Sequence, residues 1–345
     1  MRFPLAKKLI ISEEINRMLM KSLYPLRFKS IFKDKIWGGQ RIKSVMGLDF
    51  SPLQNCGEAW VLSGIENEQS VVTNGFLAEN ELNELVEIYM GDLVGEKNFE
   101  EFGNQFPILV KLIDTNDWLS IQVHPDDKLA EKRGLARGKT EMWYLLDAER
   151  DAEIVLGFKE EIDRKKYQNL LETKNLKSAL NIENVKAGDV FYVPAGRVHA
   201  LGPGMLLAEI QQTSDTTYRI YDWDRIDVDG TMRELHVDEA LDAIDFKVQK
   251  DYRTSHKVEK NKTSELVKSK YFTTNLLELD VPLQKDYVAL DSFVIYLCVE
   301  GAYALLYGDE KVTAQKGETI LIPATMNEVK IIPAPNVKIL EVYIA

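Results

Sequence analysis

One stretch, residues 188–225, constrains the fold more than any other part of the chain. It begins with a glycine turn, continues as the apolar run Val190–Val193, and turns again after Pro194. His199 follows, and a second apolar run, 205–210, ends among polar residues. Short apolar runs bounded by turn residues predict paired β-strands rather than helices. The stretch therefore predicts a hairpin with a histidine at one end and polar groups at the other.

The same pattern of short strands recurs along most of the chain, and part of it repeats. Residues 186–195 resemble residues 315–324, and residues 141–146 resemble residues 293–298. Two copies of one β unit are the simplest explanation. His199 has no histidine counterpart in the second copy, so that copy is expected to be structural. We therefore expect a mainly β fold of two sandwich or barrel units with a few helical insertions.

The polarity of the chain predicts how these units are divided. A helix-rich stretch near residues 159–180 interrupts the β pattern, and a strongly polar stretch follows residue 244. The expected parts are an N-terminal extension (1–23), a first unit (24–244) with a helical insert near 159–180, a linker (245–270) and a second β unit (271–345).

Composition excludes several classes of function. The net charge of −12 over 345 residues argues against nucleic-acid binding, which needs a basic face. The only two cysteines, Cys56 and Cys298, are far apart in the sequence and favour a reducing, cytoplasmic location. No run of 18 apolar residues predicts a membrane span. Residues 1–22 are interpreted as an amphipathic extension, or a start codon assigned too early, rather than a signal peptide.

Four residues could form a metal site. Gln122 and His124 lie two apart on a predicted strand, so their side chains share one face. Glu141 and His199 each lie in another strand-like run. Together they would supply a mixed nitrogen and oxygen site, for which zinc is the first expectation and cobalt, nickel, manganese or iron are alternatives. From periodicity alone, a structural histidine at a strand end is the commoner case.

Two motifs carry a resemblance to known families. The spacing of Gly188, Pro194, Gly196 and His199 resembles the second signature of the cupin superfamily, although the terminal asparagine of that signature is absent. Residues 119–127, LSIQVHPDD, together with residues 139–141, resemble the type I mannose-6-phosphate isomerases in their shorter bacterial form. This resemblance extends from about Tyr24 to the C-terminus. It implies two cupin-type jelly-roll barrels, the second of them degenerate.

The resemblance also implies a site. By position, one zinc ion per chain would be bound by Gln122, His124, Glu141 and His199. Arg219, Lys139 and Glu209 would be catalytic, with Glu209 and Lys139 as equally weighted candidates for the proton-transfer base. Lys139 and Arg219 would also bind the substrate, together with Ser120 and Asp215.

The implied reaction interconverts mannose 6-phosphate and fructose 6-phosphate through an enediol. The expected partner is thus a small phosphosugar, with no nucleic acid and no membrane; the oligomeric state cannot be predicted. An iron-dependent cupin oxygenase, a non-catalytic sugar-binding cupin and an isomerase of a related sugar are the alternatives. Gln122, in place of the histidine usual in cupin oxygenases, argues against the first of these.

Overall fold

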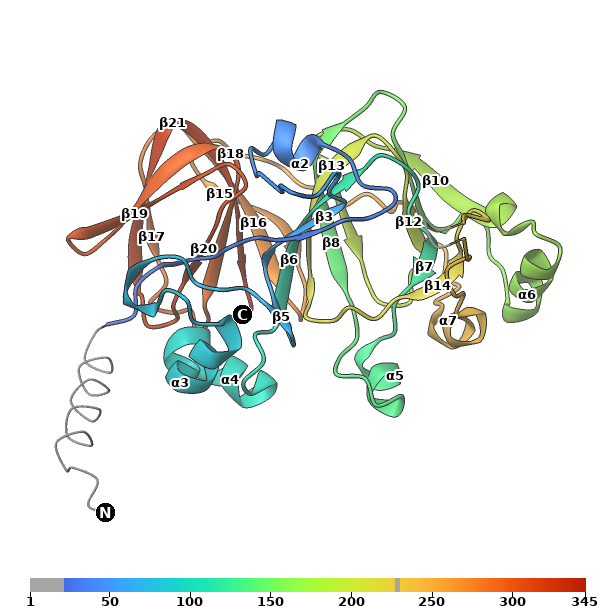
Figure 1. The fold of residues 1–345 in the computed structure, drawn as a ribbon, viewed down its shortest axis with the longest axis horizontal. Coiled ribbons are helices and arrows are strands. Elements are labelled where there is room, and N and C mark those ends of the chain that lie inside the picture. Colours follow the sequence, from blue (N-terminus) through green and yellow to red (C-terminus); the bar gives the residue numbers. More distant parts are fainter. Residues whose placement is uncertain (1–21, 227–229) are drawn as a thin grey trace, which may run out of the picture.

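The structure is a computed structural model that describes residues 22–226 and 230–345. Two β units lie side by side along the long axis of the molecule, the C-terminal one on the left of Figure 1 and the other on the right. The expected N-terminal extension, 1–23, lies outside the described residues except for its last two positions. Within the described part, no helix is long and apolar enough to cross a membrane.

The first unit consists of two facing sheets and a short ribbon. One sheet has five strands in the order β10 (Leu180–Asn184), β9 (Glu153–Phe158), β12 (His199–Leu201), β7 (Ile121–Val123) and β14 (Tyr218–Tyr221). The other has six, in the order β11 (Val190–Val193), β8 (Glu141–Ala148), β13 (Met205–Gln212), β6 (Ile108–Thr115), β3 (Glu58–Leu62) and β2 (Ile31–Lys33). The ribbon pairs β4 (Gly64–Ile65) with β5 (Glu68–Gln69).

The second unit is one eight-stranded sheet. Its main path is β1 (Leu26–Arg27), β20 (Thr319–Ile322), β18 (Val294–Tyr307), β21 (Glu328–Tyr343), β16 (Thr273–Leu279) and β15 (Thr263–Lys268). Two further strands, β17 (Leu283–Asp286) and β19 (Glu310–Gln315), pair with β21 and β18. The expectation of a mainly β fold with two cupin-type units is confirmed.

Short helices lie around the sheets. They are α2 (Arg41–Ser44), η1 (Gly75–Leu77), α3 (Leu82–Val94), α4 (Glu96–Phe102), α5 (Asp127–Lys132), α6 (Arg164–Glu172), η2 (Leu176–Ala179) and α7 (Val237–Ala243). The expected helical insert corresponds to α6 and η2. In α6, the N-cap carboxylate of Asp163 accepts a hydrogen bond from the backbone N–H of Lys166 at 2.7 Å, which satisfies one of the free donors at the helix start.

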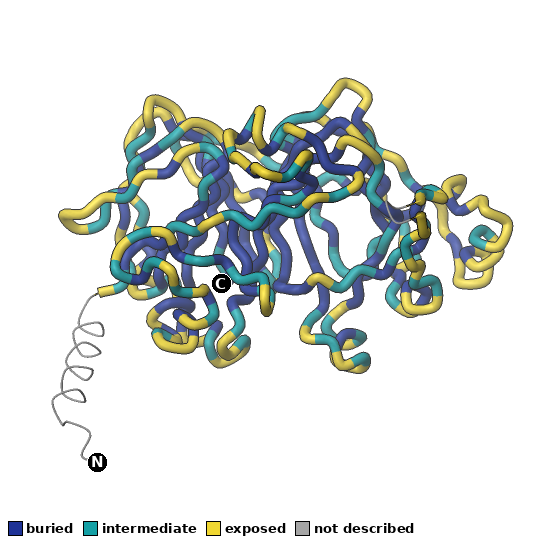
Figure 2. The backbone as a smooth tube through the Cα atoms, viewed as in Figure 1, coloured by how far each residue is buried: buried dark blue, intermediate teal, exposed yellow. Residues whose placement is uncertain are grey.

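Alternating side chains divide the interior into separate layers. In β7, Ile121 and Val123 pack outward under α6 and α7, so Gln122 between them faces the space between the two sheets. Trp143 and Phe191 of the six-stranded sheet face Leu156 of the five-stranded sheet across that space. In Figure 2 the centres of both units are dark blue, whereas exposed segments lie at the edges.

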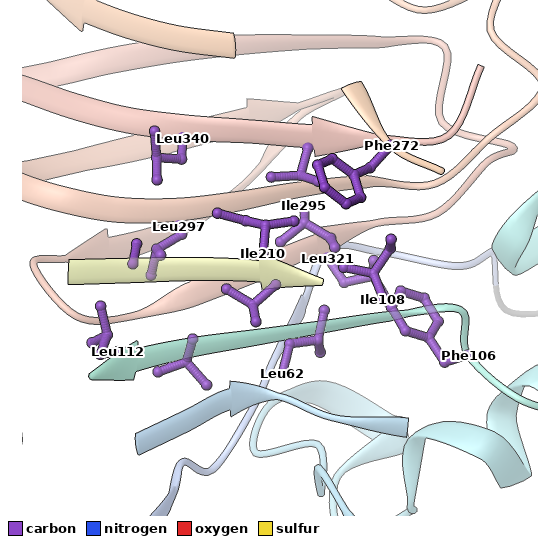
Figure 3. Close-up of a cluster of buried hydrophobic side chains, with 14 of the residues drawn as sticks. Leu62, Phe106, Ile108, Leu112, Ile210, Phe272, Ile295, Leu297, Leu321 and Leu340 are labelled. Atoms are coloured by element: carbon purple, nitrogen blue, oxygen red, sulfur yellow. The ribbon is translucent and has the colours of Figure 1, made fainter. Parts of the chain in front are cut away.

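The largest apolar cluster joins the two units. Figure 3 shows Ile108, Leu112 and Ile210 of the six-stranded sheet facing Ile295 and Leu340 of the second unit. This sheet is therefore covered on its outer face by the second unit and has its inner face free for the space between the sheets.

Two segments differ from the expected division of the chain. β15 lies inside the range expected to be a linker, yet it pairs with β16 of the second unit. β1 lies inside the range expected for the first unit, 24–244, but pairs with β20 of the second unit. Both strands are short, and each is assigned to the second unit by its pairing partner, β16 for β15 and β20 for β1. Local composition does not reveal which strands pair. The domain boundaries stay a prediction.

The internal repeat appears as equivalent strand pairs, with one difference in alignment. β11 pairs with β8 so that Val193 lies opposite Glu141, and β20 pairs with β18 so that Ile322 lies opposite Val294. Register therefore makes Val294 the counterpart of Glu141, one residue from the alignment by sequence. The second unit has an apolar side chain where the first has a carboxylate.

Candidate metal centre and active site

Three ligating side chains meet in the space between the two sheets of the first unit. His124 lies just beyond β7, Glu141 begins β8, and His199 begins β12. His124 and His199 are each about 1 % exposed and Glu141 is fully buried. One ligand atom from each residue lies within 4.8 Å of the others. The Nε2 atoms of His124 and His199 are 3.5 and 3.4 Å from the two carboxylate oxygens of Glu141.

Backbone carbonyls orient both imidazole rings. The Nδ1 atom of His124 lies 2.9 Å from the carbonyl oxygen of Thr216, and that of His199 lies 2.8 Å from the carbonyl oxygen of Arg197. A carbonyl oxygen accepts only, so each Nδ1 carries the hydrogen and each Nε2 presents its lone pair to Glu141. This is the usual arrangement for histidines that bind a metal through Nε2.

The protonation states also suit a cation. Burial, reinforced by the charge of Lys139, lowers the pKa of His124 to about 3, and burial lowers the pKa of His199. Burial opposes the charge of Glu141, but Lys139 and the two histidines outweigh it and hold the pKa of Glu141 well below its usual range. The cluster thus offers two neutral imidazoles and one carboxylate.

Gln122 and Lys139 complete this cluster. The amide nitrogen of Gln122 lies 3.1 Å from His199 Nε2, and its oxygen accepts a hydrogen bond from Ser120 Oγ at 3.3 Å. The ammonium of Lys139 lies 3.1 Å from His124 Nε2 and 2.9 Å from Glu141 Oε2. The contact with Glu141 has the distance of an ion pair without hydrogen-bond geometry, and both oxygens of Glu141 lack a hydrogen-bond donor.

A cavity of about 450 Å³ opens beside the cluster. Its volume is in the range typical of small-molecule sites. Charged side chains dominate the lining; they are Lys33, Lys35, Glu58, Glu68, Lys111, Lys139, Glu209, Asp215, Arg219 and Arg233. Gln122 and Ser120 also line it, so the cavity borders the metal cluster. The excess of cationic groups suits an anionic ligand, although the whole chain is acidic.

Glu209 is held on the inner face of the six-stranded sheet. In β13 it lies in register between Lys111 of β6 and Trp143 of β8. Its carboxylate accepts hydrogen bonds from Lys111 Nζ at 3.1 Å and from Trp143 Nε1 at 3.0 Å. Burial opposes the charge of Lys111, but Glu209 and Glu58 raise its pKa to about 12. Lys111 is thus a permanent cation beside the cavity.

Arg219 lies on β14, in register with Gln122 of β7. Its Nη1 donates to the carbonyl oxygen of Glu234 at 2.8 Å, whereas its buried Nε has no partner among the described residues. Burial and the charge of Arg233 lower the pKa of Arg219. Arg233 itself is held by two hydrogen bonds to Asp222, at 2.8 and 2.5 Å. Arg219 therefore has donor capacity left for an anion in the cavity.

The structure brings all nine sequence-predicted site residues together. His124, Glu141 and His199 form the cluster, and Gln122, Ser120, Lys139, Glu209, Asp215 and Arg219 line the cavity next to it. Asp215 differs from the rest in being an exposed residue at the rim. Their roles in catalysis and binding stay predictions.

Sequence reasoning missed several charged residues of the cavity. They are Lys33, Lys35, Glu58, Glu68, Lys111 and Arg233. For Lys111 a signal existed, because it is a lone lysine in the otherwise apolar run 108–113, and such a residue needs a buried partner. Arg233 carried no such signal, since it lies in a polar stretch of ordinary composition.

Comparison with known families gives matches to both units. Residues 25–162 match the model described as phosphomannose isomerase type I, catalytic domain. Residues 262–343 match the model described as mannose-6-phosphate isomerase, cupin domain. The chain is also 36 % identical over 317 residues to mannose-6-phosphate isomerase ManA of Bacillus subtilis, covering 89 % of this chain and 95 % of that protein.

Solved structures agree with these matches. The crystal structure of a mannose 6-phosphate isomerase from Bacillus subtilis superposes with a TM-score of 0.84 at 31 % identity, covering 93 % of this chain and 99 % of that one. A zinc-bound mannose 6-phosphate isomerase superposes with a TM-score of 0.76 at 16 % identity, over 93 % and 99 % of the two chains. The second likeness concerns the fold alone.

Proposed function

The chain belongs to the type I phosphomannose isomerases, and from this premise we propose that it is a metal-dependent aldose–ketose isomerase. It interconverts mannose 6-phosphate and fructose 6-phosphate through an enediol. The reaction takes place in the cavity beside His124, Glu141 and His199.

The buried carboxylate of Glu141 is the observation that carries the metal assignment. It is fully buried and charged, its two oxygens accept no hydrogen bond, and each lies near the Nε2 atom of a histidine. Lys139 pairs with this charge at 2.9 Å but donates no hydrogen bond to it. A buried carboxylate whose oxygens accept no hydrogen bond is costly, so a directly bound cation is the expected partner. Two imidazole nitrogens and a carboxylate suit zinc, and we assign one zinc ion per chain.

Gln122 is the proposed fourth ligand. Its amide lies within the cluster, but the nitrogen rather than the oxygen faces His199. A half-turn of the amide would present the oxygen, the atom that can bind a cation. Ser120, which donates to the amide oxygen in the present orientation, would then have to find another acceptor.

Lys139 and a divalent cation cannot both keep their places. The ammonium contacts two of the three ligand atoms at 3.1 and 2.9 Å, and like charges repel. We infer that Lys139 turns toward the cavity when the metal binds, where it reaches the substrate. When bound, zinc supplies a positive charge that stabilises the negative charge developing on the sugar oxygens.

The chain's own residues supply the remaining chemistry. The guanidinium of Arg219 can donate to an oxygen of the enediolate, because Arg219 lines the cavity and β14 places it beside Gln122. Lys139 and Glu209 are the two candidates for moving the proton between C1 and C2, and both line the cavity. Lys111 holds Glu209 in its place on the inner face of the sheet.

The deciding experiment is the conversion of mannose 6-phosphate to fructose 6-phosphate, measured before and after removal of metal with a chelator and again after zinc is added back. We expect activity to disappear on chelation and to return with zinc. Activity that persists in protein shown by elemental analysis to be metal-free would refute the metal assignment and leave the isomerase. A folded, zinc-loaded protein without activity would refute the proposed substrate and favour a related sugar or a binding role.

A further inference from the structure

A second cavity lies on the outer side of the five-stranded sheet, away from the metal centre. It has a volume of about 380 Å³ and lies between α6, η2, β14 and the start of α7. Six apolar side chains form most of its wall: Leu170, Leu171, Leu176, Ile220, Leu235 and Val237. Leu235 is 45 % exposed, although it is a large apolar residue. An apolar ligand in this cavity would remove Leu235 from water, which is favourable.

Two lysines give this cavity a cationic rim. Lys177 holds its ammonium 4.1 Å from the centre of the Trp223 ring and 5.2 Å from that of Tyr221. Neither Lys177 nor Lys174 makes a side-chain ion pair within the described residues. Asp224 also lines the cavity, and its carboxylate accepts a hydrogen bond from the Tyr221 hydroxyl at 3.1 Å. Two lysines and one aspartate thus line the cavity, which leaves an excess of positive charge.

The segment 234–237 forms part of the cavity wall and also contacts Arg219. Leu235 and Val237 line the cavity, whereas the residues that alternate with them, Glu234 and His236, contact Arg219. The carbonyl oxygen of Glu234 accepts from Arg219 Nη1 at 2.8 Å, and Nδ1 of His236 accepts from the backbone N–H of Arg219 at 3.3 Å. A ligand in the cavity would therefore contact the segment that holds the guanidinium of Arg219.

We propose that this cavity is a binding site for an organic anion with an apolar body, such as a medium-chain carboxylate, and that its occupation strengthens substrate binding at Arg219. The apolar wall takes the body of the ligand, and Lys174 and Lys177 take its charge. The site itself is independent of the proposed function; its effect on the substrate rests on that function.

The probe is decanoate below its micellar concentration. Decanol, which has the same chain length but no charge, is the control ligand. Isothermal titration calorimetry on the zinc-loaded protein is expected to show one decanoate per chain, bound at least about three-fold more tightly than decanol. Lys177→Ala should weaken decanoate binding and Leu171→Trp, which fills the cavity, should abolish it. Lys165→Ala, an exposed lysine of α6 that does not line the cavity, is the matched control and should bind as the native protein does. Circular dichroism and thermal unfolding check that each variant is folded.

The kinetic measurement tests the coupling. We expect saturating decanoate to lower the KM for mannose 6-phosphate by about two- to five-fold, with kcat unchanged, a coupling at the lower end of that usual between two sites. The effect should vanish in Leu171→Trp.

Other outcomes separate the parts of the proposal. Equal binding of decanoate by the native protein, Lys177→Ala and Leu171→Trp would overturn the site. A KM that rises with decanoate in all variants would indicate competition in the active site and overturn it as well. Variant-sensitive binding with an unchanged KM would overturn the coupling alone. Binding to a protein without isomerase activity would contradict the proposed function and support the cavity.

Discussion

Several charged side chains of the first unit are largely buried. Glu58 is the clearest case outside the metal cluster. Its carboxylate accepts a hydrogen bond from Trp60 Nε1 at 2.7 Å and lies 3.5 Å from Lys35 Nζ and 4.0 Å from Lys111 Nζ. Burial opposes its charge, but Lys111 and Lys35 outweigh this and lower its pKa to about 2. Ionised Glu58 thus stabilises the fold.

This shift predicts how stability depends on pH. Because the pKa of Glu58 is lower in the folded protein than in the unfolded chain, its contribution is present above about pH 4.5 and is lost as the pH falls toward about 2. Glu58→Gln should therefore lower the free energy of unfolding by about 2–3 kcal/mol near pH 7, and by progressively less below about pH 4.5. Denaturant unfolding over this pH range measures it.

Glu66→Gln is the control, because Glu66 is exposed and makes no ion pair within the described residues. It should follow the native protein at every pH. If the native protein and Glu58→Gln lost stability in parallel on acidification, Glu58 would not be the group responsible.

Arg219 is the residue whose loss should separate catalysis from metal binding. It borders the cluster without contributing a ligand atom, so Arg219→Ala should keep the bound zinc and the fold while lowering kcat about 10²-fold or more. Arg219→Lys keeps the positive charge but loses the planar fork, and should recover only part of the activity. Zinc content by elemental analysis and steady-state kinetics test this. Near-native turnover in Arg219→Ala would remove the residue from the mechanism.

At the scale of secondary structure, strand register places the charged groups of the active site. One row of six residues crosses the six-stranded sheet from edge to edge: Ile31, Trp60, Lys111, Glu209, Trp143 and Phe191. Because side chains alternate along each strand, all six lie on the face that the second unit leaves free. A shift of one residue in β13 would carry Glu209 to the other face.

Removing only one member of the Lys111–Glu209 ion pair should therefore lower the free energy of unfolding strongly. Lys111→Met leaves Glu209 and Glu58 without their shared cation and should destabilise the protein by about 3–5 kcal/mol. Adding Glu209→Gln to this variant should recover part of the loss, because one buried charge is removed. Denaturant unfolding of both variants gives the comparison.

The exposed pair of Lys43 and Asp49 provides the matched control, at 2.9 Å and more than half exposed on both sides. Lys43→Met should change the free energy of unfolding by less than about 1 kcal/mol. A similar effect of both lysine substitutions would contradict the role assigned to burial.

For the whole molecule, the apolar interface between the two units makes them one cooperative structure. Phe106 precedes β6 of the first unit and Phe293 precedes β18 of the second, and their rings lie 4.6 Å apart. Both side chains are fully buried and belong to the largest apolar cluster, in which Figure 3 labels Phe106. The second unit thus stabilises the sheet whose inner face holds Glu141 and Glu209.

Phe293→Ala should lower the free energy of unfolding by about 3–5 kcal/mol, because it leaves a cavity between the units. Zinc binding and isomerase activity should persist in the protein that stays folded. Phe293 packs against the outer face of the six-stranded sheet, whereas the site lies on its inner face. Val288→Ala, at a position 67 % exposed, should be near neutral. Unfolding in two separate steps, with only the second unit affected, would contradict a shared core.

Some features could be predicted from the sequence because they follow from local rules. Gln122 and His124 share a face because strand side chains alternate, and the helix-rich stretch near residues 159–180 contains α6 and η2, as expected. Residue types suggested the four proposed zinc ligands, and the resemblance to a known family implied them.

Contacts between residues far apart in the chain became visible in the folded structure alone. The pairing of Lys111 with Glu209, 98 positions later, and the place of Arg233 beside Arg219 follow from strand register and packing, which local pattern does not encode. The same holds for the counterpart of Glu141, which is Val294 by register. The sequence was enough to predict the site residues, but not the charged residues that contact them. A buried charge is stabilised by its contacts in the fold and not by its position along the chain.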